Sequence, residues 1–152
     1  MSEPTVRHAT VVVERDLDAP PERVYGAWAH ERGSWDVPND DWVVAEVENE
    51  LQPDGRQRTC FGPKGDPMFE SSGRYMIVED GRLLIMAGVM HERGRPVTAT
   101  MTTVEVIPHS DGTRVIVTDQ SAYFEGQTED MREAGWRKIV ERLDAYLRND
   151  EA

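Results

Sequence analysis

Long apolar segments and cysteine are both scarce in this chain. The longest uninterrupted apolar run, Leu83–Met90, has eight residues, far short of the ~20 that a membrane-spanning helix needs. The single cysteine, Cys60, has no partner for an intramolecular disulfide, and its strand-like surroundings predict a buried, inert thiol. The polar segment Met1–His8 lacks the apolar stretch of a signal peptide. We therefore expect no membrane partner and a cytoplasmic location.

Basic residues are outnumbered. The chain has 29 Asp and Glu against 17 Lys and Arg, for a net charge of −12, and no local basic patch offsets this excess. Nucleic acids and anionic membrane surfaces are therefore excluded as expected partners, because an acidic chain repels both. A hydrophobic content of 38% in 152 residues is enough for one core, so residues 1–152 are expected to form a single domain.

Motifs for metals and cofactors are also missing. The four histidines are scattered, no Cys-x-x-Cys pair occurs, and Asp36–Asp41 lacks the spacing of a calcium loop. The sequence contains no Gly-x-Ser-x-Gly elbow, phosphate-binding glycine loop or dinucleotide fingerprint. We therefore expect neither a metal nor a cofactor.

The first third of the chain has the pattern of a strand followed by short helices. Thr5–Leu17 is rich in β-branched residues and ends at Asp18–Pro21, where two prolines stop a strand. Apolar residues then recur every three to four positions and predict a helix over 21–29. One more helical turn is expected over Glu31–Trp35.

From Trp42 to Tyr123 the chain alternates apolar and polar residues and breaks at turn signals about every ten residues. Six strands are predicted, over 42–52, 56–61, 69–79, 82–92, 97–107 and 113–123. Connections this short permit only antiparallel neighbours. The sheet is therefore predicted to be a meander.

The last segment, Thr128–Arg148, predicts a long amphipathic helix with Thr128 as its N-cap. Its apolar stripe comprises Met131, Gly135, Trp136, Ile139, Val140, Leu143, Tyr146 and Leu147. The expected fold is α+β: a curved antiparallel sheet of about seven strands wrapped around this helix, with two short helices after the first strand.

This order of elements resembles the START-like superfamily, also called SRPBCC or helix-grip. The stretches Asp18–Trp28, Leu51–Arg56, Gly112–Val115 and Gly135–Trp136 resemble the heat-shock-protein-90 ATPase activator homologue family within it. The resemblance implies an elongated apolar cavity between sheet and helix that binds hydrophobic molecules. It also implies, more remotely, a stress-response protein that interacts with a chaperone and regulates its ATPase.

Successive side chains of a strand point to opposite faces of the sheet, so every second residue of the last two strands is expected to face such a cavity. Val117, Asp119 and Ser121 share one face of the last strand, and Thr100 and Thr102 share one face of the strand before it. A desolvated carboxylate there would have a raised pKa, which makes Asp119 a candidate acid or base. The alternative is that Asp119 lies at the rim and is solvated.

Large aromatic and sulfur-containing side chains are expected to line or close the cavity, with ordinary core packing as the alternative. Met90 and Met101 belong to this group, and the full set of predicted ligand-binding residues is Trp28, Trp35, Tyr75, Met86, Thr100, Thr102, Val117, Asp119, Ser121 and Trp136. Tyr75 is the second candidate acid or base, because a buried hydroxyl must find a partner.

Three functions remain open at this point. The first is binding of a small hydrophobic molecule of lipid, polyketide or aromatic type. The second is an enzyme of cyclase or dehydratase type that uses Asp119 or Tyr75, and the third is the chaperone interaction. Because Leu83–Met90 is apolar on both faces, either a second subunit covers the outer face of this strand or a neighbouring loop masks it, and a homodimer is predicted.

Overall fold

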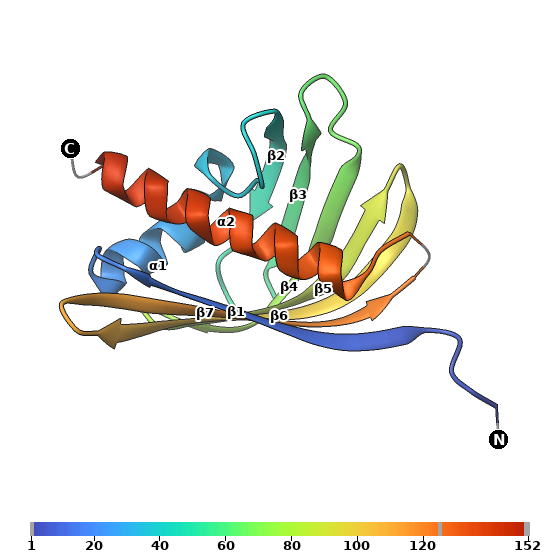
Figure 1. Ribbon diagram of the computed structural model, residues 1–152, viewed down its shortest axis with the longest axis horizontal. Helices are drawn as coiled ribbons and strands as arrows, with labels where there is room; N and C mark the ends of the chain where they lie inside the picture. Colours follow the sequence, from blue (N-terminus) through green and yellow to red (C-terminus); the bar gives the residue numbers. More distant parts are fainter. Residues whose placement is uncertain (1, 125, 151–152) are drawn as a thin grey trace.

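The computed structural model describes residues 2–124 and 126–150. In chain order the elements are β1 (Arg7–Leu17), α1 (Pro21–His30), the 3-10 turn η1 (Arg32–Ser34), β2 (Trp42–Asn49), β3 (Arg56–Pro63), β4 (Phe69–Glu79), β5 (Leu83–Glu92), β6 (Arg95–His109), β7 (Gly112–Tyr123) and α2 (Glu129–Asp150). Figure 1 shows one curved sheet, with α2 lying across its concave side and α1 at one end. The predicted α+β helix-grip fold is confirmed.

All seven strands belong to one antiparallel sheet in the order β1-β7-β6-β5-β4-β3-β2. Strands β2 to β7 form the predicted meander, since each pairs with its neighbour in sequence. The first strand joins the sheet beside the last, with Val13 opposite Val117. This long-range pairing leaves β1 and β2 as the two edges of an open half-barrel.

Turn chemistry moves two of the predicted strand ends. Arg93 and Gly94 both have positive φ, 48° and 82°, as a tight two-residue hairpin requires. Pairing therefore continues to Glu92 opposite Arg95, and β6 begins two residues before the predicted position 97. Strand β2 ends at Asn49 instead of 52, because the Glu50 and Gln52 amides donate to carbonyls within the next turn and hairpin.

The core lies between the concave face and the C-terminal half of α2. Along β7, alternate residues from Val115 to Tyr123 are buried, which confirms the predicted inward face. The helix contributes Val140, Leu143 and Leu147 to this core. Met131, at the start of the predicted stripe, is 51% exposed instead. The N-terminal half of α2 therefore does not close onto the sheet as its C-terminal half does.

Two residues that were predicted to be buried, Met101 and Cys60, are more exposed in the structure. Met101 is 39% exposed on the outer face, opposite Ala87 of β5, so it forms no cavity wall. Cys60 is half-buried instead of buried, with its Sγ 3.9 Å from Glu70 Oε2, because inward-facing Thr59 turns its neighbour outward.

The outer-face residues of β5 are half-buried, and the homodimer stays a prediction. Among the described residues, no helix is both long and apolar enough to span a membrane.

Two glycines face each other where β4 and β5 pair, Gly73 opposite Gly88. A Cβ on Gly73 would lie 2.0 Å from the Ala87 carbonyl oxygen, and one on Gly88 would lie 2.3 Å from that of Ser72. No side chain fits at either position without displacing the neighbouring backbone. The close approach of bare backbone thus fixes how β4 and β5 meet beneath α2.

We predict that Gly73→Ala lowers the free energy of unfolding by about 1–3 kcal/mol, because its methyl group would push β5 away. Urea unfolding followed by circular dichroism measures the change. Gly26→Ala in α1 is the control, since a Cβ there meets nothing within 4 Å, and it should leave stability equal or slightly higher. Equal stability of Gly73→Ala and the wild type would contradict the proposed contact.

Candidate functional site

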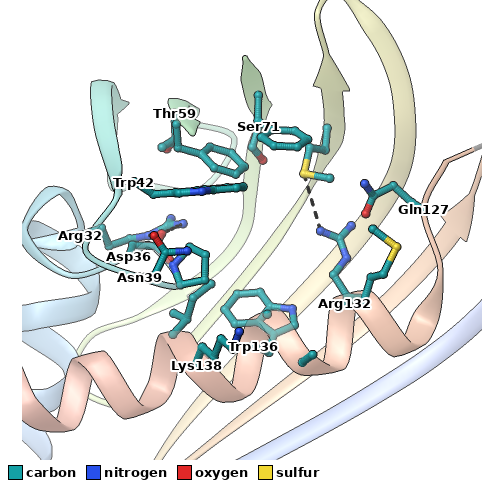
Figure 2. Close-up of a pocket in the computed structure, with 18 residues that line it drawn as sticks. Arg32, Asp36, Asn39, Trp42, Thr59, Ser71, Gln127, Arg132, Trp136 and Lys138 are labelled. Atoms are coloured by element: carbon teal, nitrogen blue, oxygen red, sulfur yellow. Dashed lines mark hydrogen bonds and ion pairs between the residues drawn. The ribbon is translucent and has the colours of Figure 1, made fainter. Parts of the chain in front are cut away.

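A pocket of about 410 Å³ opens between the N-terminal half of α2 and strands β2 to β4 (Figure 2). The helix presents Met131, Arg132, Gly135 and Trp136, and the loop before β2 presents Pro38 and Asn39. This is the end of α2 at which the apolar stripe is exposed. The pocket exists because the helix and the sheet diverge there.

A smaller hollow of about 90 Å³ adjoins the pocket on the sheet side. Both spaces share the lining residues Arg32, Ser71, Met90, Arg132 and Trp136. Gly73 and Gly88 line the hollow, so part of its surface is backbone without side chains. The pair of glycines that fixes the approach of β4 and β5 also leaves space above them.

Three aromatic rings form one wall of the larger pocket. Trp42 and Phe69 stack with their centroids 5.4 Å apart, and Phe61 stacks on Phe69 at 5.5 Å. The register of the hairpin places Phe61 directly opposite Phe69. Trp136 lies on the helix side, across the pocket from Trp42 (Figure 2). A flat apolar molecule would find aromatic surfaces on both sides.

The Asp119 carboxylate lies at the centre of a polar network beneath α2. It is 1% exposed, so the alternative that it lies solvated at the rim is wrong. Its Oδ2 accepts a hydrogen bond of 2.8 Å from Trp136 Nε1 and lies 3.2 Å from Arg132 Nε. Its Oδ1 accepts one from the Ser121 hydroxyl. Both oxygens of this carboxylate are engaged within the protein.

Arg132 connects this network to the neighbouring strand. Its Nη2 donates to Thr98 Oγ1 at 2.6 Å and to Thr100 Oγ1 at 2.9 Å. Its Nη1 points to Met90 Sδ at 3.8 Å, the dashed line in Figure 2. Thr100 also shares a 2.7 Å hydrogen bond with Ser121. The predicted polar group of Thr100, Thr102, Asp119 and Ser121 is therefore brought together, since register also sets Thr102 opposite Asp119.

A second buried ion pair lies at the other side of the pocket. Arg32 donates to Asp36 Oδ2 from Nε at 2.8 Å and from Nη2 at 2.5 Å, while its Nη1 points to Met86 Sδ at 3.9 Å. Burial raises the pKa of Asp36, and the adjoining Arg32 guanidinium opposes this rise only in part. Both residues line the larger pocket, so it has a cation at each side.

The predicted ligand-binding residues separate into two groups. Met86, Thr100, Thr102 and Asp119 line the hollow, and Trp136 lines both spaces. The others, Trp28, Trp35, Tyr75, Val117 and Ser121, line neither space and are buried in the core. The large aromatics of this second group close the end of the half-barrel instead, with Trp28 stacked on Trp136 at 6.2 Å.

Tyr75 finds the partner that its burial requires within the protein. Its hydroxyl donates to Asn49 Oδ1, and Asn49 Nδ2 donates to the Ala29 carbonyl at 2.6 Å. Burial raises the pKa of Tyr75, so the phenol keeps its proton. This hydroxyl connects β4, β2 and α1 and does not reach either space.

Residue-based prediction missed the aromatic wall and both arginines. The signal for Phe61 and Phe69 was present, because a hairpin around the loop at 62–68 pairs them across its base. Arg132 precedes Trp136 by one helical turn and so borders the buried stripe. A long side chain at such a border places its charged head over the sheet.

One family model matches most of the chain, and solved structures share its fold. The family described as "Activator of Hsp90 ATPase homolog 1-like protein" matches residues 18–148. Mll3558 from Rhizobium loti is 30% identical with a TM-score of 0.80, and 93% of this chain and 99% of that chain are covered. A protein from Rhizobium leguminosarum is 24% identical with a TM-score of 0.85, covering 95% and 97%.

A more distant likeness is to DynU16, a protein in the dynemicin biosynthetic locus. It is 18% identical with a TM-score of 0.68, and 91% of this chain and 47% of that chain are covered. At this identity the likeness shows the fold alone. The search of curated proteins finds no match.

We predict that removing the two partners of the Asp119–Arg132 pair lowers the free energy of unfolding by unequal amounts. Arg132→Met should lower the free energy of unfolding by about 3–5 kcal/mol, because it leaves a buried carboxylate without its cation. Asp119→Asn should cost only about 1–2 kcal/mol, since the amide still accepts from Trp136 and the guanidinium is 16% exposed to water.

Urea unfolding of both variants gives the comparison. Arg137→Met is the matched control on α2, because its ion pair with Glu133 is 60% exposed on the arginine side, and it should change stability by less than about 0.5 kcal/mol. If Asp119→Asn lost more stability than Arg132→Met, Asp119 would not be held as a buried anion by Arg132.

Proposed function

The chain belongs to the Activator of Hsp90 ATPase homolog 1-like family, and from the site described above we propose that it binds a small hydrophobic molecule between the sheet and α2. The observation that carries the proposal is the pocket of about 410 Å³ with its stacked aromatic wall. Ligand sites of roughly 300–1,000 Å³ with mostly apolar linings and a few polar groups are typical of small-molecule binding.

Its walls favour a flat, aromatic or polyketide-like body. The stacked rings of Trp42 and Phe69 line the pocket on the sheet side, and Trp136 lines it on the helix side, across from Trp42. Met90 and Met131 complete the apolar surface with side chains that adapt to irregular shapes. A ligand held between rings gains the burial energy of both of its faces.

An acid–base enzyme is the weaker alternative. A general acid or base must reach the proton that it transfers, directly or through one water. The oxygens of Asp119 already accept from Ser121 and Trp136 and adjoin Arg132. Tyr75, the other candidate, lines neither space and donates to Asn49. These contacts favour binding over turnover.

Gly135 allows a sharp test of the binding site. It lines the pocket, and a Cβ at this position meets nothing within 4 Å. The Cβ of Gly135→Leu therefore has room and its side chain should occupy pocket space, and the helix should be as stable or more stable, because glycine is about 1 kcal/mol worse than alanine inside a helix. Ala145→Leu is the matched control, on an exposed position of α2 outside the pocket.

We predict that wild type and Ala145→Leu quench or shift their tryptophan fluorescence on titration with naphthalene derivatives, while Gly135→Leu binds at least tenfold more weakly. Native mass spectrometry of freshly purified protein gives the second readout, with a co-purified small molecule retained by the control and lost from Gly135→Leu. Equal binding by all three proteins would place the ligand elsewhere, and absence of binding to wild type would refute the proposal.

A further inference from the structure

The charge around the pocket is opposite in sign to that of the whole chain. Among the described residues that line the larger pocket, Arg32, Arg132 and Lys138 are cationic and Asp36 is the carboxylate. The adjoining hollow adds Asp119. Three cations against two carboxylates give a formal sum of +1 around the two spaces, with Lys138 at the exposed rim, in a protein of net charge −12. A pocket for a purely neutral ligand has no need of buried cations, because each costs desolvation.

The two arginines, whose side chains are 17% and 16% exposed, have the same unusual pattern of contacts. Each has a carboxylate beside its Nε, and each directs its Nη1 to the sulfur of a methionine on β5, Met86 for Arg32 and Met90 for Arg132. A thioether is a weak acceptor. Each Nη1 group therefore keeps most of its capacity to donate a hydrogen bond.

Arg132 is the less neutralised of the two. Arg32 donates twice to the same oxygen of Asp36, at 2.8 and 2.5 Å. Arg132 Nε lies 3.2 Å from Asp119 Oδ2 but is not aligned to donate to it, and it is buried without a hydrogen-bond partner. Asp119 is meanwhile stabilised by Trp136 and Ser121. Nη2 donates to two threonines and Nε is buried, so Nη1, beside the weak acceptor Met90 Sδ, is the donor group that Arg132 offers to a ligand.

We propose that the ligand is a hydrophobic carboxylate, whose anionic group binds Arg132 in place of the Met90 thioether while its flat body lies between Trp42 and Trp136. This inference rests on the proposed function and adds the chemical class of the ligand. Arginine suits the role because its guanidinium stays charged and its rigid plane fixes the direction of the Nη1 N–H groups. Thr98 and Thr100 on β6 accept hydrogen bonds from Nη2 and so orient the guanidinium plane.

The test compares two probes of one shape, 2-naphthoate and the neutral 2-naphthamide, by isothermal titration calorimetry. Wild type should bind the carboxylate at least about tenfold more tightly than the amide, since a charged hydrogen bond contributes about 1.5–3 kcal/mol, or roughly 10–100-fold. Arg132→Lys keeps the positive charge beside Asp119 but removes the planar guanidinium and its Nη1 donor group. It should bind 2-naphthoate about tenfold more weakly and 2-naphthamide within about twofold of wild type.

Arg137→Lys is the matched control, because Arg137 lies on the same helix and pairs with Glu133 outside the pocket. It should preserve both affinities. Retained amide binding by Arg132→Lys shows that the pocket is intact, so a folding defect is recognised. Equal affinity of wild type for both probes, or an unchanged carboxylate preference in Arg132→Lys, would overturn the inference and leave the proposed function standing. Failure of both probes to bind wild type would overturn both.

Discussion

Burial of one carboxylate sets the register between the helix and the sheet. Asp119 faces inward on β7 with 1% of its surface exposed, and a charge removed from water in this way must be paired and hydrogen-bonded. Arg132 and Trp136, one turn apart on α2, both reach its Oδ2. With these contacts made, Val140 and Leu143 follow into the core, and Gly135 lies between the two anchors over the pocket. The contacts of Asp119 therefore position both the core packing of α2 and the pocket.

The two halves of α2 consequently have different tasks. Its C-terminal half packs against the core through Leu143 and Leu147 and is held to β1 by Asp144, whose carboxylate lies 2.9 Å from Arg15 Nη2. The N-terminal half is held by polar contacts while Met131 stays exposed. Polar anchoring keeps the two surfaces apart, whereas apolar packing would draw them together. A pocket beneath a firmly attached helix is the result.

How far the sequence predicts this structure depends on the range of the interaction. Alternation is local, so the inward faces of β6 and β7, and with them Thr100, Thr102 and Asp119, were predictable. For Trp28 and Trp35 the sequence left cavity lining and core packing open, and they lie in the core, because which aromatics close the end of the sheet depends on how seven strands coil together. The arginines were missed because a flexible, charged side chain gives no periodic signal, and its final position depends on acceptors from other elements, such as Thr98 on β6.

The pairing of β1 with β7 also bears on how the chain reaches this fold. Val13 must meet Val117, about a hundred residues further along, so the entropy of closing that loop is overcome only when nearly the whole domain is present. The hairpins from β2 to β7 join neighbours and form quickly by comparison. Strand β1 is synthesised well before its partner β7, and the side chains of Val11 and Val13, buried in the finished fold, stay uncovered during that interval. Until β7 arrives, β1 is an unpaired strand of the kind through which partly folded chains associate.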